Sequence, residues 1–124
     1  MPNQRRDQQF DFIEFPAGSV TELQKAAAFF QAVFGWNYKA WGDDYSDTQD
    51  SGIGSGINAD PSHQPAHPLP VIYTTDLEAA RSRVMAAQGT LTRDIFSFPG
   101  GRRFHFTDPS GNELAVWSDA EAGA

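Results

Sequence analysis

The most constraining feature of this sequence is that one pattern of caps, turns and apolar stretches occurs twice. A capping box, in which Ser or Thr is followed three residues later by Glu, opens at Ser19 and again at Thr75, 56 residues further on. A glycine able to end a helix follows each box, at Gly35 and at Gly89, 54 residues apart. Two repeats are too few for a solenoid, so we expect two modules that pair around a shared surface.

The first copy predicts one helix and four strands. Residues 10–15 alternate between two faces and stop at Pro16-Ala17-Gly18, which is typical of a strand and a turn. The helix between Ser19 and Gly35 is indicated by an apolar stripe at helical spacing: Val20, Leu23, Ala27, Phe30 and Phe34. Three short stretches, 36–41, 45–49 and 51–57, are expected to be strands.

The second copy begins after the Pro-rich segment 59–68. A strand is expected over 69–74, then a helix from Thr75 to Gly89, then strands over 90–98, 102–107 and 112–117. The order is therefore βαβββ, twice, which predicts an α+β fold. We expect a single domain over residues 1–124, with module 1 at about 9–58, a linker at 59–68 and module 2 at about 69–118. An unrelated α+β sandwich is the alternative.

Composition narrows the classes of partner. The formal charge of −7 and the pI near 4.7 repel phosphate backbones and anionic membrane surfaces. No stretch approaches the length of an apolar membrane span, and the N-terminus lacks the apolar region of a signal peptide. Cys is absent, so disulfides and thiolate chemistry are excluded. We expect a cytoplasmic protein that binds neither nucleic acid nor a membrane.

Three strings carry a resemblance to a known family. The strings "FIEFP", "AAFFQAVFGW" and "FHFTDPSGNELAVW" resemble the first strand, the first helix and the final hairpin of the vicinal oxygen chelate superfamily, which includes glyoxalase, bleomycin-resistance and extradiol-dioxygenase proteins. The resemblance implies two βαβββ modules forming an open, cup-shaped barrel, and a homodimer. In metal-using relatives the cup holds a divalent cation, bound by His, Glu or Gln from the first and last strands of each module.

The metal-ligand positions that the resemblance implies are occupied by residues unsuited to metal. They fall on Phe12, Pro70 and Ala115, whose side chains have no lone pair for a cation. The fourth lies within 51–57, where Ser51 and Ser55 are the only polar side chains. We therefore expect no metal cofactor, unless a divalent metal occupies a displaced site formed by Glu14, His105 and Glu113.

The final hairpin predicts which side chains line the cup. Pairing Asp108 with Asn112 across the turn places His105 opposite Ala115, and the same register gives the other pairs: Thr107 with Glu113, Phe106 with Leu114, Phe104 with Val116, and Arg103 with Trp117. One face is then wholly apolar and suits the helix: Phe104, Phe106, Leu114 and Val116. The other face carries Arg103, His105, Glu113 and Trp117. By the same alternation we assign Phe12, Glu14, Ile72 and Thr74 to the cup.

These side chains form a largely apolar pocket with a few polar groups, as in many small-molecule sites. The expected ligand-binding residues are Phe12, Ile72, Thr74, Arg103 and Trp117, and the candidate catalytic residues are His105, Glu14 and Glu113. His105 is expected to titrate near neutrality, with a neighbouring carboxylate raising its pKa. The structural alternatives are a hydrogen-bonded His105, an ion pair of Glu14 with Arg102 or Arg103, and a solvated Glu113.

Other motifs favour ordinary structural roles. His63 and His67 have the spacing of a helical metal pair, but Pro61, Pro65 and Pro68 prevent that helix. The string "SGIGSG" lacks the Lys of a phosphate-binding loop and indicates a strand with a close approach. Two functional classes remain. The first is a protein that binds an aromatic or polar small molecule without a metal, and the second is an enzyme of the lyase, isomerase or dioxygenase type using His105 with Glu14 or Glu113.

Overall fold

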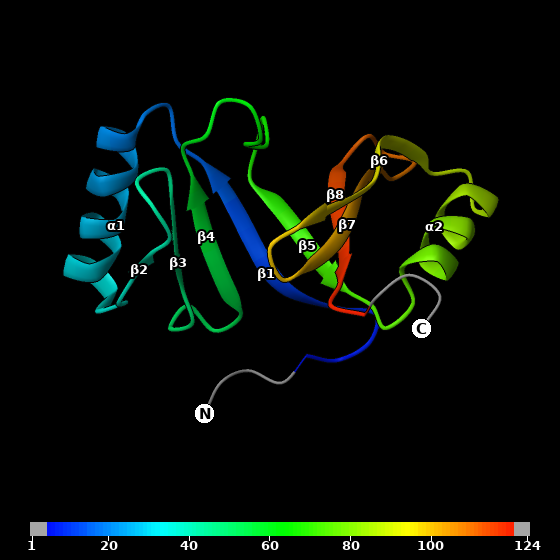
Figure 1. Ribbon diagram of the computed structural model, residues 1–124, viewed down its shortest axis with the longest axis horizontal. Coiled ribbons are helices and arrows are strands. Elements are labelled where there is room, and N and C mark those ends of the chain that lie inside the picture. The colour runs from blue at the N-terminus through cyan, green and yellow to red at the C-terminus, as the bar shows by residue number, and fades with distance from the viewer. Residues whose placement is uncertain (1–4, 121–124) are drawn as a thin grey trace. The chain divides into compact units, whose positions relative to one another are not determined.

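The computed structural model describes residues 5–120 and has the order βαβββ in each half of the chain (Figure 1). The first half contains β1 (Gln9–Pro16), α1 (Val20–Phe34), β2 (Lys39–Ala40), β3 (Tyr45–Thr48) and β4 (Gly54–Asn58). The second half contains β5 (Leu69–Tyr73), α2 (Leu77–Ala86), β6 (Thr90–Phe98), β7 (Gly101–Thr107) and β8 (Glu113–Ser118). The predicted α+β class with two βαβββ modules is confirmed.

The described chain divides into two compact units. Unit 1 comprises Phe12–Leu69, and unit 2 comprises Arg5–Asp11 together with the chain from Pro70 onwards. The first residues of β1 belong to unit 2, and the bounds expected for the two modules stay predictions. That the whole chain is one domain stays a prediction.

In unit 1 the strand order is β2-β3-β4-β1, with β4 parallel to β1 and antiparallel to β3. Helix α1 lies against β3 and β4, and Leu23 of the helix packs with Ile57 and Ala59 in the core. The cap predictions for this helix are confirmed. The Ser19 hydroxyl accepts a hydrogen bond from the Glu22 amide at 3.1 Å, and Gly35 adopts the left-handed conformation with φ of 76°.

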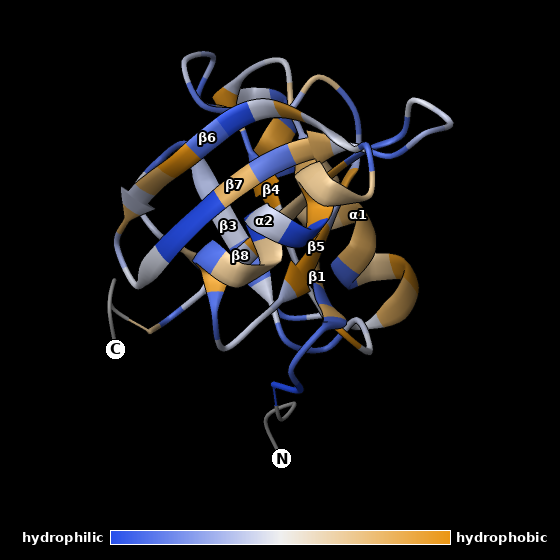
Figure 2. Cartoon of the chain, turned by 90° about the vertical axis from the view of Figure 1, so that its right-hand side faces the viewer, coloured by the Kyte–Doolittle hydropathy of each residue, from blue (hydrophilic) through white to orange (hydrophobic). Residues whose placement is uncertain are grey.

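In unit 2 the strand order is β5-β8-β7-β6, with β5 parallel to β8 and the other pairs antiparallel. Hydrophilic and hydrophobic residues alternate along β6 and β7 (Figure 2), as expected for strands with two different faces. Leu77 and Ala80 of α2 pack on Phe104 and Val116. Helix α2 therefore covers one face of this sheet, and the opposite face is called the helix-free face of unit 2 below.

The ends of α2 differ from the prediction by one to three residues. The N-cap is Asp76 and not Thr75, because the Asp76 carboxylate accepts the Ala79 amide at 3.0 Å. The helix ends at Ala86, and Gln88, with φ of 72°, occupies the left-handed position expected for Gly89. The amide of Gly89 instead bonds to the Val84 carbonyl at 2.8 Å, which completes a Schellman-type ending.

Three strands of unit 1 are shorter than predicted: β3 by one residue, and β2 and β4 by more. Of the stretch 36–41 only Lys39–Ala40 pairs as a strand, since the Trp36 ring stacks 5.3 Å from the ring of Phe30 and 5.2 Å from that of Phe34. Strand β4 begins at Gly54 because the Ser51 hydroxyl bonds to the Ile53 carbonyl in the preceding turn. Local side-chain contacts outweigh β propensity in both places.

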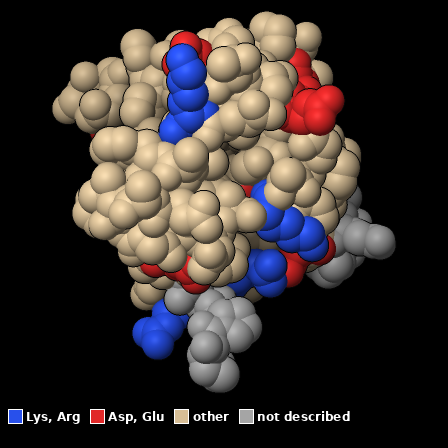
Figure 3. Space-filling view, turned by 90° about the vertical axis from the view of Figure 1, so that its left-hand side faces the viewer, with Lys and Arg blue, Asp and Glu red and all other residues tan. Residues whose placement is uncertain are grey.

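The outer side of α1 is apolar. Phe29, Val33 and Phe34 of this helix are each more than half exposed, and much of the surface seen from that side carries neither acidic nor basic residues (Figure 3). Among the described residues, no helix is long and apolar enough to cross a membrane.

Candidate ligand-binding site

The β7–β8 hairpin has the predicted register. The Asp108 carboxylate accepts the amides of Ser110 and Asn112, each at 2.9 Å, and closes the turn. All five predicted cross-strand pairs are observed, from Thr107 with Glu113 to Arg103 with Trp117. The turn chemistry and the alternation of the strands were therefore sufficient to set this register.

The helix-free face of unit 2 joins side chains from β6, β7 and β8 with Tyr73 of β5, which pairs with Trp117. His105 and Arg103 come from β7, and Trp117 comes from β8. All three point to the side of the sheet opposite to that of the core residue Phe104. Strand β6 adds further side chains to this face because Arg93 pairs with His105, Phe96 with Arg103, and Phe98 with Gly101. Two register shifts interrupt β6 between Leu91 and Phe96. Such bulges re-aim side chains and are common next to functional sites.

His105 lies at the centre of this face. Its side chain is only 9% exposed, and its ring lies 5.8 Å from that of Phe96. The imidazole Nδ1 is 3.9 Å from the Glu113 carboxylate, too far for a hydrogen bond. The Nε2 atom is buried and has no hydrogen-bond partner among the described residues. Buried polar atoms without partners are rare in folded proteins.

The expectation that His105 titrates near neutrality is wrong. Burial, reinforced by the charges of Arg103 and Arg93, lowers its pKa to about 4. The carboxylate expected to raise this pKa is Glu113, but it lies beyond hydrogen-bond distance and accepts the Thr92 hydroxyl at 2.7 Å. His105 is therefore neutral at neutral pH.

Trp117 is held firmly at one end of the helix-free face. Its indole Nε1 donates to both carboxylate oxygens of Asp11 at 3.0 Å, and its ring meets Tyr73 edge-on at 5.3 Å. Burial raises the pKa of Asp11, although the Trp117 hydrogen bond opposes the rise. Phe98 lies 6.1 Å from the Trp117 ring on the other side. The face thus presents a row of aromatic rings.

Arginines add positive charge to this row. The Arg93 guanidinium lies 3.6 Å from the centre of the Phe96 ring, and that of Arg103 lies 5.4 Å from the same ring. A cation held over an aromatic ring places positive charge beside a flat apolar surface, on which a planar ligand can stack. The arrangement can hold a flat, partly polar molecule by stacking and charge.

The assignment of Ile72 and Thr74 to the same face as His105 is wrong. Strand β5 pairs with β8 in parallel, with Ile72 beside Val116 and Tyr73 beside Trp117. Ile72 therefore points to the α2 side, where it packs on the core of unit 2, and Thr74 has the same parity. Strands joined by no turn have no local signal for their register, so the sequence could not show which alternate set of β5 faces which way.

The two remaining candidates, Phe12 and Glu14, lie in unit 1. A side chain at Gly56 would collide with the Phe12 ring and the Tyr45 hydroxyl, so the two rings occupy the space over this glycine. Glu14 is 3% exposed and accepts a hydrogen bond from the Asn58 amide at 3.1 Å. That these residues share one site with His105 stays a prediction.

Arg102 is not available to Glu14. Its guanidinium donates to both carboxylate oxygens of Glu78 on α2, at 2.6 and 3.2 Å. Of the linker histidines, His63 bonds to Asp60 at 2.9 Å, and both His63 and His67 are exposed, as expected for surface residues. Arg102, His63 and His67 therefore do not contribute to the candidate site around His105.

The residues at the expected metal-ligand positions do not fit a metal. The side chains of Phe12 and Ala115 carry no atoms that could bind a metal. Pro70 points to the same side of the sheet as Ile72, and the residue of β5 beside Ala115 is Val71. Ser51 and Ser55 hydrogen-bond to each other at 2.8 Å. Among residues 5–120 there is no group of three His, Asp or Glu side chains placed to hold a cation.

Sequence reasoning missed Asp11, Tyr73, Arg93 and Phe96. The alternation that identified His105 applied to the β7–β8 hairpin, where the turn is visible in the sequence. The bulges of β6 break its alternation, and the parity of Tyr73 depends on the parallel pairing of β5 with β8. The basic and aromatic content of 93–98 was the only available signal.

Comparison with known proteins identifies a superfamily to which this chain is similar. The family model described as Glyoxalase/Bleomycin resistance protein/Dioxygenase superfamily matches residues 16–116. No curated protein sequence matches the chain.

Solved structures share the fold at low sequence identity. A superfamily member from Vibrio splendidus has a TM-score of 0.64 at 15% identity, covering 86% of this chain and 96% of its own. Methylmalonyl-CoA epimerase from Mycobacterium tuberculosis has a TM-score of 0.65 at 14% identity, covering 98% and 94%. A Mn(II)-bound glyoxalase from Novosphingobium aromaticivorans has a TM-score of 0.66 at 17% identity, covering 98% of this chain and 42% of that one.

Proposed function

The chain belongs to the Glyoxalase/Bleomycin resistance protein/Dioxygenase superfamily, and from that premise we propose that it binds a small aromatic molecule on the helix-free face of unit 2 without using a metal. The observation that carries the proposal is the buried Nε2 of His105, which has no hydrogen-bond partner among the described residues. Leaving such an atom without a partner costs about 1–3 kcal/mol. A ligand that supplies the partner recovers this free energy.

The protonation of His105 suggests which partner it needs. With its pKa lowered to about 4, the ring is neutral and carries one proton. The Glu113 carboxylate, 3.9 Å from Nδ1, favours that proton on Nδ1 by charge. Nε2 then has a lone pair to offer, so the ligand donates a hydrogen bond from a hydroxyl or amino group.

The surroundings of His105 suggest the rest of the ligand. The rings of Phe96, Phe98 and Trp117 favour an aromatic body, and the guanidinium of Arg93 on the Phe96 ring favours a negative charge on it. We therefore favour an aromatic carboxylate that also carries a hydroxyl or amino group. The Phe96 ring on the bulged strand lies 5.8 Å from the His105 ring, and Nε2 is buried, so a ligand that reaches Nε2 has to displace neighbouring side chains such as Phe96.

The enzymatic alternative is less well supported. An acid–base pair works best when its pKa lies near the operating pH. A histidine whose pKa is lowered to about 4 accepts protons weakly at neutral pH. Binding a ligand without transforming it requires only the neutral imidazole, which accepts a hydrogen bond at Nε2.

Tryptophan fluorescence tests the proposal, with 4-hydroxybenzoate and benzoate as matched probes. Stacking near Trp117 should quench its emission, and 4-hydroxybenzoate should bind about five- to tenfold more tightly than benzoate because only it donates to Nε2. His105→Ala should abolish that difference, and Trp117→Phe should abolish the signal while Trp36 and Trp41 remain. A chelator should change nothing.

Three outcomes would contradict the proposal. They are equal binding of the two probes, quenching that survives Trp117→Phe, and binding lost on adding a chelator. The first would show that Nε2 does not meet the ligand, the second that the site lies elsewhere, and the third that a metal takes part.

A further inference from the structure

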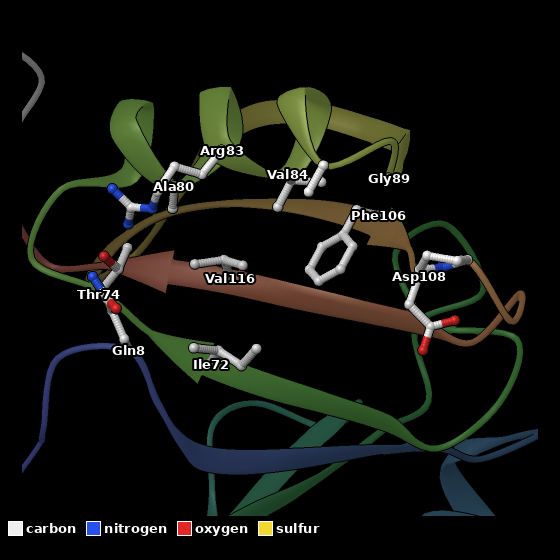
Figure 4. A pocket seen from close by; sticks show the side chains of 12 residues that line it. Gln8, Ile72, Thr74, Ala80, Arg83, Val84, Gly89, Phe106, Asp108 and Val116 are labelled. Atoms are coloured by element: carbon white, nitrogen blue, oxygen red, sulfur yellow. The ribbon is translucent and has the colours of Figure 1, made fainter.

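An open hollow lies on the opposite side of unit 2, between α2 and the sheet. It has a volume of about 340 Å³ and is lined by α2 together with the helix-side residues of β5, β7 and β8 (Figure 4). Ile72, Phe106 and Val116 form its floor, and Val84 of α2 forms part of its wall. Since these residues have the opposite parity to His105 and Trp117, the hollow is separate from the site proposed above.

The hollow exists because α2 leaves part of the sheet uncovered. The helix contacts β6, β7 and β8, and Ile72 of β5 lines the hollow beside it. Three of the five residues of the helix and its ending that border the space are small: Ala80, Ala87 and Gly89. Ile72 and Phe106 therefore stay only partly buried, although both pack on the core of unit 2. Burying their remaining apolar surface would be favourable.

The two ends of the hollow carry opposite charges (Figure 4). Arg83 lies at the end near Thr74 and Gln8, and its guanidinium has no hydrogen bond or ion pair among the described residues. The carboxylate of Asp7 acts on it only through space, since Asp7 accepts hydrogen bonds from Thr74 and Thr75. This end is thus able to receive an anion.

The other end is closed to anions. Asp108 lies there, and its carboxylate is fully used in the β7–β8 turn by the amides of Ser110 and Asn112 and the side chain of Asn112. A carboxylate placed beside it would be repelled. A charged ligand therefore has one favourable orientation in this hollow.

We propose that this hollow binds a linear aliphatic monocarboxylate. Its carboxylate pairs with Arg83, and its chain runs over Ile72 and Val116 past Phe106 towards the Asp108 end. The volume falls in the lower part of the range of small-molecule sites, roughly 300–1,000 Å³. Apolar contact supplies the affinity, and the two charges set the direction.

Octanoate and 1-octanol, both below their aggregation limits, test this proposal as charged and uncharged probes of equal length. Backbone amide chemical shifts of the uniformly labelled full chain report where each binds. Both probes should shift the amides of Val84, Phe106 and Val116 and leave that of His105 unchanged. Arg83→Gln should weaken octanoate about fivefold, the value expected of a partly exposed ion pair, and leave octanol unaffected.

A matched control comes from the same helix. Arg81 has the same charge, but it pairs with Asp94 at 2.8 Å and does not line the hollow. Arg81→Gln should therefore leave the affinity for octanoate unchanged. Val84→Trp should fill the hollow and abolish binding of both probes. If that variant does not fold, the comparison of Arg83→Gln with Arg81→Gln still decides.

Several results would overturn the proposal. Equal weakening by both arginine variants would show an effect of net charge alone, and shifts confined to the His105 face would place octanoate in the other site. A dimer that buries Val84 and excludes octanoate would assign the hollow to a second copy of the chain. Because His105→Ala should not affect octanoate, the two sites can fail independently.

Discussion

The two units repeat one architecture but use the sheet faces opposite their helices differently. In unit 1 this helix-free face carries Phe12 and Glu14, because their partners Gly54 and Gly56 alternate with Ile57, which packs on α1. In unit 1, Phe12 and Tyr45 fill the space over Gly56, and Glu14 pairs with Asn58, so the polar group on this face has a partner within the unit. In unit 2, the corresponding face holds His105 with an unsatisfied ring nitrogen. The repeat therefore specifies the fold twice, while the buried side-chain atoms without a hydrogen-bond partner among residues 5–120 lie in the second copy.

The difference originates in the last strand of each unit. Strand β4 contributes Gly54 and Gly56 next to Phe12 and Glu14, which lets large side chains of the unit itself pack there. Strand β8 contributes Ala115 and Trp117 beside His105 and Arg103. Because glycines have no side chain, large side chains of the same unit can fill the space beside them. Trp117, held by its hydrogen bonds to Asp11, instead forms a rigid aromatic surface.

The largest expected effect concerns the unsatisfied histidine of unit 2. Its pKa in the folded chain, about 4, lies below the unfolded value near 6.5, so the unfolded state takes up the proton first as the pH falls. The stability from neutral His105 is complete above about pH 6.5 and is lost as the pH falls towards 4, by about 3 kcal/mol. Urea unfolding across this range should show that loss in the wild type.

The variant His105→Gln isolates this effect because glutamine does not titrate. Its stability should depend less on pH between about 6.5 and 4, while all carboxylates titrate as before. His63→Gln, at an exposed position of unit 1, should behave like the wild type. Parallel pH profiles for His105→Gln and the wild type would show that the histidine is not buried as described.

An intermediate effect is expected from closing the space over Gly56 in unit 1. Gly56→Ala introduces a Cβ that meets Phe12 and Tyr45, so it should lower the free energy of unfolding by about 1–3 kcal/mol. Gly18→Ala is the matched control, because nothing lies within 4 Å of its added Cβ. Chemical denaturation measures both. If the two variants are equally stable, the helix-free face of unit 1 is not filled, and the contrast between the units fails.

The smallest effect is expected from removing the helix N-caps, which should lower the free energy of unfolding by a similar amount in the two units. Ser19 and Asp76 accept the amides three residues ahead at 3.1 and 3.0 Å, so Ser19→Ala and Asp76→Ala should each cost about 1 kcal/mol. Asp76→Asn keeps the acceptor and should cost less than Asp76→Ala. Denaturation midpoints and slopes provide the comparison. A much larger loss in one unit would mean that its helix depends on the cap more than on packing.

Local chemistry made much of the fold and part of the site predictable. The capping box of Ser19, the left-handed Gly35 and the turn closed by Asp108 act over a few residues, so their effects are visible in the sequence. Alternation then placed His105 and Trp117 on one face of a hairpin whose register the turn determines. The same reasoning failed for Ile72, which no turn connects to its neighbouring strand.

The sequence by itself determined the repeated βαβββ order, the register of the last hairpin and the absence of metal-binding side chains at Phe12 and Ala115. Only the tertiary structure decided that Ile72 faces α2, that the Phe96 ring lies beside His105, and that the pKa of His105 falls instead of rising. The physical reason is range. Caps and turns are interactions between near neighbours in the chain, whereas parallel pairing, burial and the charges of Arg93 and Arg103 depend on strands that meet only when the chain folds.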